Sequence, residues 1–256
     1  MTLTDLHCHI LPGIDDGAAS PDESIKMLAR EFRGGVRRIA LTSHFDCEKE
    51  NVRAFLDKRQ KAFEDLKEEL GAYPDLKSEL ELKPAAEVMY SPNLVFEELS
   101  ELCIEGTSSI LIELPVRRRP YNLAETLFGL QKRGFDPIIA HVERYGYLMS
   151  EPAAIYKMVN NGIFFQINAG VLLDKGRTAA FCMDLIDWEL VQIVASDAHG
   201  AEERRPNLDQ GVESIRKKLG EDCISRIVEY SNKLFAGEYP ETPDPYCPKK
   251  VFGRWR

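Results

Sequence analysis

The five histidines of this 256-residue chain each follow an apolar, strand-like segment: His7, His9, His44, His141 and His199. Residues two apart on a strand point the same way, so His7 and His9 should face one point while Cys8 faces away. Asp197 and His199 repeat this spacing at the end of the last such segment. Because neutral imidazole is the commonest metal ligand in proteins, the two pairs predict a shared metal site.

Four carboxylates occupy similar positions near strand ends: Asp16, Glu87, Glu113 and Asp197. Glu113 is embedded in an otherwise apolar run, where a carboxylate needs a cation or a hydrogen-bond partner. Each residue taken alone has another explanation. Glu113 could pair with one of the arginines 117–119, Asp16 could be an Asx-turn residue, and a single buried histidine usually just forms hydrogen bonds. The whole set together indicates a cluster of metal ligands.

Strand and helix patterns alternate along the chain. Strand patterns cover residues 3–9, 37–43, 79–88, 108–114, 136–141, 163–168 and 191–196, and helix patterns cover 21–33, 51–70, 93–101, 122–133, 152–161, 178–188, 208–219 and 221–235. Several of the strand patterns are apolar almost throughout, which is typical of parallel strands buried on both faces. Seven alternating units predict an α/β barrel, with a doubly wound open sheet as the alternative. In such a barrel the active site lies at the C-terminal ends of the strands, where the histidines fall.

Composition limits the function classes. The net charge of −9 and the pI of about 5.2 disfavour a nucleic-acid partner. The N-terminus lacks a signal-peptide pattern, and no apolar run approaches the ~20 residues that span a bilayer. We therefore expect a cytoplasmic protein that is not integral to a membrane. Its six scattered cysteines should mostly be reduced core residues.

Residues 1–237 are expected to form one domain, followed by a change in composition. Residues 238–256 contain Pro240, Pro243, Pro245 and Pro248 and should form an extended C-terminal tail.

The motifs occur in a specific order. They are Asp-Leu-His-Cys-His at 5–9, Asp-Asp-Gly at 15–17, Thr-Ser-His at 42–44, Ala-Glu at 86–87, His-Val-Glu-Arg at 141–144 and Ser-Asp-Ala-His at 196–199. This series resembles the polymerase and histidinol phosphatase (PHP) superfamily. Within it, the sequence is similar to the manganese-dependent bacterial protein-tyrosine phosphatases of capsule and exopolysaccharide operons. Carboxylates at 16 and 113 match that branch, since relatives acting on small phosphate esters often carry histidine at both positions.

The resemblance implies a distorted (β/α)7 TIM-like barrel, the PHP fold, with three divalent ions. The first ion would take His7, His9, Glu87 and Asp197; the second Glu87, Glu113 and His141; the third Asp16, His44 and His199. Manganese is the expected metal, although ligands that offer only nitrogen and oxygen also suit Fe, Zn or Co.

The resemblance also implies an activity: dephosphorylation of phosphotyrosine on a protein, with a bacterial polysaccharide-export tyrosine autokinase and its tyrosine-rich tail as the expected partner. A metal-bound hydroxide would attack phosphorus in line. Asp197 and His199 would lie at the reacting centre with Arg144 and Arg204, and arginine can grip phosphate oxygens in a bidentate fork. Spacing leaves open whether Arg204 or Arg205 contacts phosphate, with a slight preference for Arg204. Arg117 and its two neighbours are either a solvated loop or a docking patch for an acidic phosphotyrosine peptide.

The sequence also has to be compared with other classes of function. A small-molecule phosphatase of the histidinol-phosphatase type is the main alternative, and a nuclease or a non-catalytic metal-stabilised binding protein is disfavoured. A cysteine phosphatase would need a phosphate-cradling loop, but the segment between Cys47 and Arg53 has no glycine and carries two acids that would repel phosphate. The sequence leaves open whether the chain forms a homo-oligomer.

Overall fold

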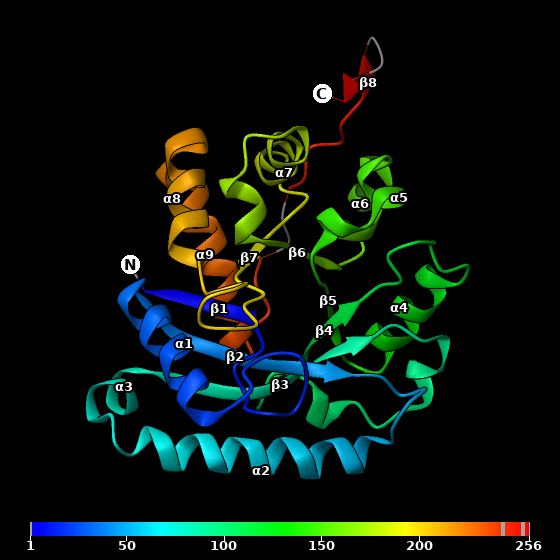
Figure 1. The fold of residues 1–256 in the computed structure, drawn as a ribbon. Helices are drawn as coiled ribbons and strands as arrows, with labels where there is room; N and C mark the ends of the chain where they lie inside the picture. Colours follow the sequence, from blue (N-terminus) through cyan, green and yellow to red (C-terminus); the bar gives the residue numbers. More distant parts are fainter. Residues whose placement is uncertain (1, 242–243, 252–253, 256) are drawn as a thin grey trace.

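A computed structural model describes residues 2–241, 244–251 and 254–255. Seven parallel strands lie side by side in their order along the chain (Figure 1). They are β1 (Leu3–Cys8), β2 (Val36–Phe45), β3 (Glu81–Met89), β4 (Ser109–Glu113), β5 (Asp136–Ile139), β6 (Phe164–Asn168) and β7 (Ile193–Ala195). This sequential order confirms the predicted barrel and makes the doubly wound alternative wrong, because a doubly wound sheet reverses its strand order partway.

The barrel is nearly closed between its first and last strands. The peptide N–H of His9 donates to the carbonyl of Ala198 at 2.8 Å, and the N–H of Asp197 donates to the carbonyl of His7 at 2.8 Å. Closure is therefore made by the segments that carry the predicted ligands, at the C-terminal ends of β1 and β7.

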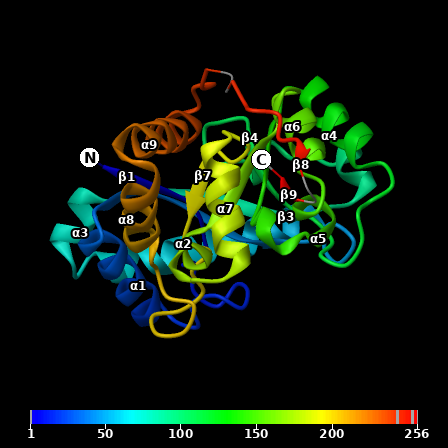
Figure 2. The ribbon, with the colours of Figure 1, turned by 90° about the horizontal axis from the view of Figure 1, so that it is seen from above.

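Helices surround the strands (Figure 2). They are α1 (Pro21–Arg33), α2 (Val52–Leu70), α3 (Pro74–Glu79), α4 (Leu123–Lys132), α5 (Gly146–Met149), α6 (Pro152–Val159), α7 (Arg177–Asp187), α8 (Leu208–Leu219) and α9 (Glu221–Ala236). The start of α1 follows its sequence signal, since the Ser20 side chain accepts a hydrogen bond from the Glu23 peptide N–H and Pro21 occupies the first turn.

The barrel interior is apolar towards the N-terminal ends of the strands. Strand residues such as Leu6, Leu111 and Phe164 form a buried cluster there with Leu234 and Phe235 from the end of α9. Because α9 closes this end with apolar side chains, the opposite end is the one that can hold a polar site.

One predicted helix is wrong. Residues 93–101 form no α-helix but two short 3-10 segments, η1 (Pro92–Phe96) and η2 (Ser100–Leu102). The Arg133 guanidinium donates to the carbonyls of Leu94, Val95 and Glu97. These bonds satisfy carbonyl groups that an α-helix would pair with its own N–H groups.

Several short elements were not predicted. They are α3, α5 and the 3-10 segments η3 (Val142–Arg144) and η4 (Ala169–Leu173). The third strand begins at Glu81, because α3 occupies residue 79 where the strand pattern was expected to begin.

The C-terminal segment is only partly extended. Its end forms a small antiparallel pair, β8 (Lys250–Val251) with β9 (Arg254–Trp255), which the sequence did not predict. Before it, the Tyr246 peptide N–H donates to the Trp188 carbonyl at 3.0 Å, so the segment packs on the barrel. Pro243 lies outside the described residues.

All six cysteines are free, and four of them are buried. Within the part of the chain that the structure describes, no helix combines the length and the apolar character needed to cross a membrane.

Candidate metal centre

All nine residues predicted as metal ligands converge at the C-terminal ends of the strands. Their side-chain nitrogen and oxygen atoms fall into four overlapping groups in which the atoms lie within 4.8 Å of one another. The groups are His7, His9 and Asp197; His7, Glu87 and His141; His44, Glu87 and Glu113; and His9, Asp16, His44 and His199. The last group adds His9 to the set expected for a third ion.

The spacing of these atoms fits metal coordination. The Nε2 atoms of His7 and His9 are 3.2 Å apart, and Glu87 Oε2 lies 3.3 and 3.4 Å from them. Two ligand atoms that each bind one ion at about 2.1 Å are separated by roughly 3.0–3.4 Å in octahedral or tetrahedral geometry. The distances between His7, His9 and Glu87 match that separation.

Among the residues that the structure describes, two buried carboxylate oxygens in the centre lack a hydrogen-bond partner: Glu87 Oε2 and Asp197 Oδ1. Leaving a buried charged oxygen unpaired is costly. Both oxygens face the His7 Nε2 atom, at 3.3 Å in each case. The donor set is therefore complete for a cation, and the residues present fit divalent metal ions.

Backbone strain is concentrated in this centre. Of the four non-glycine residues with positive φ in the described part of the chain, His141 (30°), Asp197 (50°) and Arg204 (47°) belong to it. The strand geometry expected for Asp197 and His199 is wrong, because β7 ends at Ala195. The left-handed conformation at Asp197 brings the two side chains together instead, and such strain is typical of functional sites.

Two loop residues hold His9 in place, and sequence reasoning missed their role. Asp15 Oδ2 accepts from His9 Nδ1 at 2.8 Å and from the His44 peptide N–H at 3.0 Å, and Asp15 Oδ1 accepts from the Gly17 N–H. A Cβ at Gly17 would lie 2.2 Å from the His9 carbonyl oxygen, so only glycine fits. The Asp-Asp-Gly motif thus supplies a positioning carboxylate beside the predicted ligand Asp16.

The charges around His9 and His199 shift their pKa values in opposite directions. Burial alone would lower the pKa of His9, but its hydrogen bonds to Asp15 and Glu87 raise it to about 10. The same contact with His9 outweighs burial at Asp15 and lowers its pKa to about 2. Burial and the charge of His9 lower the pKa of His199 to about 4. Without metal, protons on His9 would supply the positive charge that the carboxylates require.

The predicted substrate arginines lie at different distances from the centre. Arg144 and Arg204 both donate to Asp197 Oδ2, and the Arg204 bond is 3.1 Å long. Arg205 is exposed, and among the described residues it has no hydrogen bond or ion pair through its side chain. Arg117 is exposed on the loop after β4, where its neighbour Arg119 lies 3.7 Å from Glu151.

The segment from Cys47 to Arg53 lacks the features of a cysteine phosphatase, since Arg53 lies in α2 and pairs with Asp57 at 3.2 Å. Burial raises the pKa of the Cys47 thiol, which is the opposite of what a nucleophilic cysteine needs.

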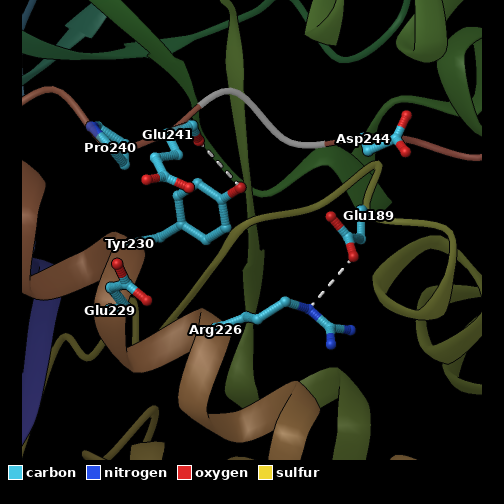
Figure 3. Close-up of a pocket in the computed structure, with 7 residues that line it drawn as sticks. All are labelled: Glu189, Arg226, Glu229, Tyr230, Pro240, Glu241 and Asp244. Atoms are coloured by element: carbon cyan, nitrogen blue, oxygen red, sulfur yellow. Dashed lines mark hydrogen bonds and ion pairs between the residues drawn. The ribbon is translucent and has the colours of Figure 1, made fainter.

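A pocket separate from the metal centre lies near the N-terminal end of β7, between α9 and the C-terminal segment (Figure 3). Its volume is about 250 Å³, and four acidic residues line it. Arg226 lies 3.3 Å from Glu189 in its wall. No histidine lines this pocket, so it differs in chemistry from the metal centre.

Known proteins with similar sequences identify the family of this chain. A family described as capsular polysaccharide synthesis, CpsB/CapC, matches residues 3–235. The chain belongs to this family. The tyrosine-protein phosphatase YwqE of Bacillus subtilis (strain 168) is 29% identical over 98% of this chain and 99% of its own length. The tyrosine-protein phosphatase CpsB of Streptococcus pneumoniae is 29% identical over 85% and 91%.

Solved structures agree with this membership of the CpsB/CapC family. A crystal structure from a study of YwqE and of S. pneumoniae CpsB, described as unique metal-dependent tyrosine phosphatases, matches with a TM-score of 0.85. It is 28% identical and covers 95% of this chain and 98% of that chain. A phosphotriesterase homology protein from Escherichia coli, 14% identical with a TM-score of 0.54, shares the fold alone.

Proposed function

We propose that this chain is a metal-dependent phosphatase that removes phosphate from phosphotyrosine in a protein. The observation that carries the proposal is the convergence of nine nitrogen- and oxygen-bearing ligand residues at one end of the barrel. Membership of a family whose relatives are named tyrosine-protein phosphatases supports the choice of substrate. We assign this activity to residues 1–237 and expect it in the cytoplasm.

The proposed ligand sets hold three ions, with manganese preferred. His7, His9, Glu87 and Asp197 would hold the first, Glu87, Glu113 and His141 the second, and Asp16, His44 and His199 the third. When bound, such ions lower the pKa of water and neutralise charge on the phosphoryl group. Four carboxylates carry about −4 and three divalent ions about +6, so the centre would retain about +2 to attract a phosphate dianion.

The arginines would position that phosphate. Arg144 and Arg204 both reach Asp197 Oδ2, so their guanidinium groups lie at the edge of the metal centre. Their side chains are 36% and 45% exposed, which leaves N–H groups available to an incoming phosphate. Bidentate bonds from arginine hold a phosphoryl group in one orientation.

The leaving group favours tyrosine. A phenol has a pKa of about 10 and departs more readily than an alkoxide, so it needs less help from a general acid. Burial raises the pKa of Glu143, beside Arg144, to about 7, so its carboxyl can carry a proton near neutral pH. We propose as partner the tyrosine-rich tail of a bacterial polysaccharide-export autokinase, with Arg117 contacting residues beside the phosphotyrosine.

The test compares two substrates with the manganese-loaded protein. We expect kcat/KM for a phosphotyrosyl peptide to exceed that for histidinol phosphate by at least about tenfold, and His199→Ala to lose most activity. Glu203→Gln, an exposed change in the same loop, is the control and should leave activity unchanged. A preference for histidinol phosphate would make the chain a small-molecule phosphatase, and full activity in His199→Ala would refute the ligand assignment.

A further inference from the structure

Six of the seven strands or the segments after them deliver a proposed metal ligand, and β6 delivers none. Its inward-facing end carries two amides, Gln166 and Asn168, of which Gln166 is fully buried. We propose that Gln166 and Asn168 form an amide relay that fixes the hydrogen-bonding state and orientation of two metal ligands, His7 and Asp197. This inference rests on the proposed metal centre and names positioning residues for it.

The relay begins at the backbone of His141. The peptide N–H of His141 donates to Gln166 Oε1 at 2.6 Å. A peptide N–H can only donate, so the atom facing it must be the oxygen of the Gln166 amide. The orientation of the Gln166 amide is thereby fixed by the backbone.

The fixed oxygen then sets the tautomer of His7. His7 Nδ1 lies 3.2 Å from the same Gln166 Oε1, and an oxygen that accepts there requires a proton on Nδ1. In the neutral ring the lone pair is therefore on Nε2, which faces the centre. Asp15 does the same for His9 through its Nδ1. With both rings neutral, two nitrogen lone pairs would face each other at 3.2 Å, an arrangement that needs a proton or a metal ion between them.

The NH₂ group of the Gln166 amide fixes the orientation of the Asn168 amide. Gln166 Nε2 donates to Asn168 Oδ1 at 2.8 Å, so the Asn168 NH₂ group must face the opposite way. Asn168 Nδ2 donates to Asp197 Oδ2 at 2.7 Å. With Arg144 and Arg204, this oxygen has three donors, while Asp197 Oδ1 has none and faces His7 Nε2 at 3.3 Å. The relay thus helps to keep one Asp197 oxygen free for metal.

A nearby glutamine provides a matched control. Gln192 is also buried, and it accepts from the Phe165 peptide N–H at 3.1 Å and donates to the Glu189 carbonyl at 2.6 Å. Its partners are backbone groups of β6 and of the turn before β7, and neither belongs to a proposed metal ligand. Loss of Gln192 should therefore reduce stability without changing metal affinity.

The first measurement is calorimetric titration of the metal-free protein with Mn²⁺. We expect Gln166→Met, which keeps the shape but removes both hydrogen-bonding groups, to weaken Mn²⁺ binding about 10–100-fold. Gln166→Glu keeps an acceptor for His7 and His141 and should recover part of that loss. Asn168→Ala should weaken binding by a smaller factor, and Gln192→Met should bind Mn²⁺ as the wild type does.

The second measurement reads the tautomer directly. With only five histidines, long-range ¹H–¹⁵N correlation spectra of the zinc-loaded protein can resolve each ring. We expect a protonated Nδ1 on His7 in the wild type and in Gln166→Glu, and a changed His7 pattern in Gln166→Met. Unaltered His7 signals together with wild-type Mn²⁺ affinity in the Gln166 and Asn168 variants would overturn the relay alone. Failure of the wild type to bind Mn²⁺ would instead overturn the metal centre, and the relay with it. If Gln166→Met does not fold, Gln166→Glu and Asn168→Ala still decide the question.

Discussion

Replacement of Asp15 by asparagine tests how the loop after β1 positions His9. Asp15 receives three donors: Oδ2 accepts from His9 Nδ1 and the His44 N–H, and Oδ1 accepts from the Gly17 N–H. Asparagine has one oxygen, so at least one donor would face its NH₂ group. Losing one hydrogen bond to a charged group costs about 1.5–3 kcal/mol, and we expect Asp15→Asn to destabilise the metal-free protein by that amount near pH 6.

The pH dependence follows from the two pKa values. His9 has a pKa of about 10 in the folded protein against an ordinary 6.5. Its contribution to the free energy of unfolding is therefore full below pH 6.5 and is lost as pH rises towards 10. Asp15 has a folded pKa of about 2 against 3.8, so its contribution is present above pH 3.8 and is lost as pH falls towards 2. The difference in free energy of unfolding between the wild type and Asp15→Asn should therefore be largest between about pH 4 and 6.5. It should become smaller at lower and at higher pH.

The assay is urea unfolding of the metal-free proteins from pH 3 to 10, followed by Mn²⁺ titration at pH 7.5. Positioning partners of ligating histidines typically contribute 10–100-fold to metal affinity, so Mn²⁺ binding should weaken by about that factor. Asp57→Asn, on the exposed side of α2, is the control. A stability difference independent of pH, with unchanged Mn²⁺ affinity, would refute the role given to Asp15.

Three further predictions concern other parts of the molecule. Arg204→Ala should lower kcat/KM for a phosphotyrosyl peptide by about 10²-fold, because a lost phosphate contact is worth about 2–3 kcal/mol. Arg205→Ala should change kcat/KM less than about threefold. Equal losses in the two variants would contradict the assignment of Arg204 as the phosphate contact. Replacing arginines 117–119 by alanine should raise KM for an acidic phosphotyrosyl peptide and leave turnover of a small aryl phosphate unchanged, and equal effects on both substrates would exclude docking. Burial and the charge of Asp5 raise the pKa of Glu31. The protonated Glu31 therefore adds to the free energy of unfolding at low pH, and this stabilisation is lost as pH rises. Glu31→Gln should therefore melt about 2–4 °C above the wild type at pH 9 and close to it at pH 5, for a gain of about 1 kcal/mol, and a lower melting temperature at pH 9 would contradict this.

Much of the metal centre could be predicted from the sequence because its ligands follow apolar strands. Parallel strands place their C-terminal ends on one side of a barrel, so His44, Glu87 and Glu113 had to converge once the strands were recognised. The pair His7 and His9 followed from the two-residue period of a strand. These inferences need only local patterns and one rule of topology.

The groups that hold the ligands could not be predicted in the same way. Gln166 and Asn168 occupy ordinary strand positions, and their hydrogen-bond partners among the metal ligands come from other strands, far away in the sequence. Asp197 and His199 meet through a positive φ rather than through strand alternation. Residues 93–101 contain 3-10 segments instead of an α-helix, and three of their carbonyls accept hydrogen bonds from Arg133, more than 30 residues later. The contacts of Gln166, Asn168 and Arg133 join residues distant in the sequence, so local patterns do not reveal them.

The central claim is that the nine clustered residues hold metal ions that support phosphotyrosine hydrolysis. The most direct test is a crystal structure of the manganese-loaded protein with anomalous difference maps recorded on both sides of the manganese edge. We expect three anomalous peaks among these residues, each within about 2.0–2.6 Å of its nitrogen and oxygen ligands. A protein that hydrolyses phosphotyrosyl peptide but shows no anomalous peak at the strand ends would contradict the account.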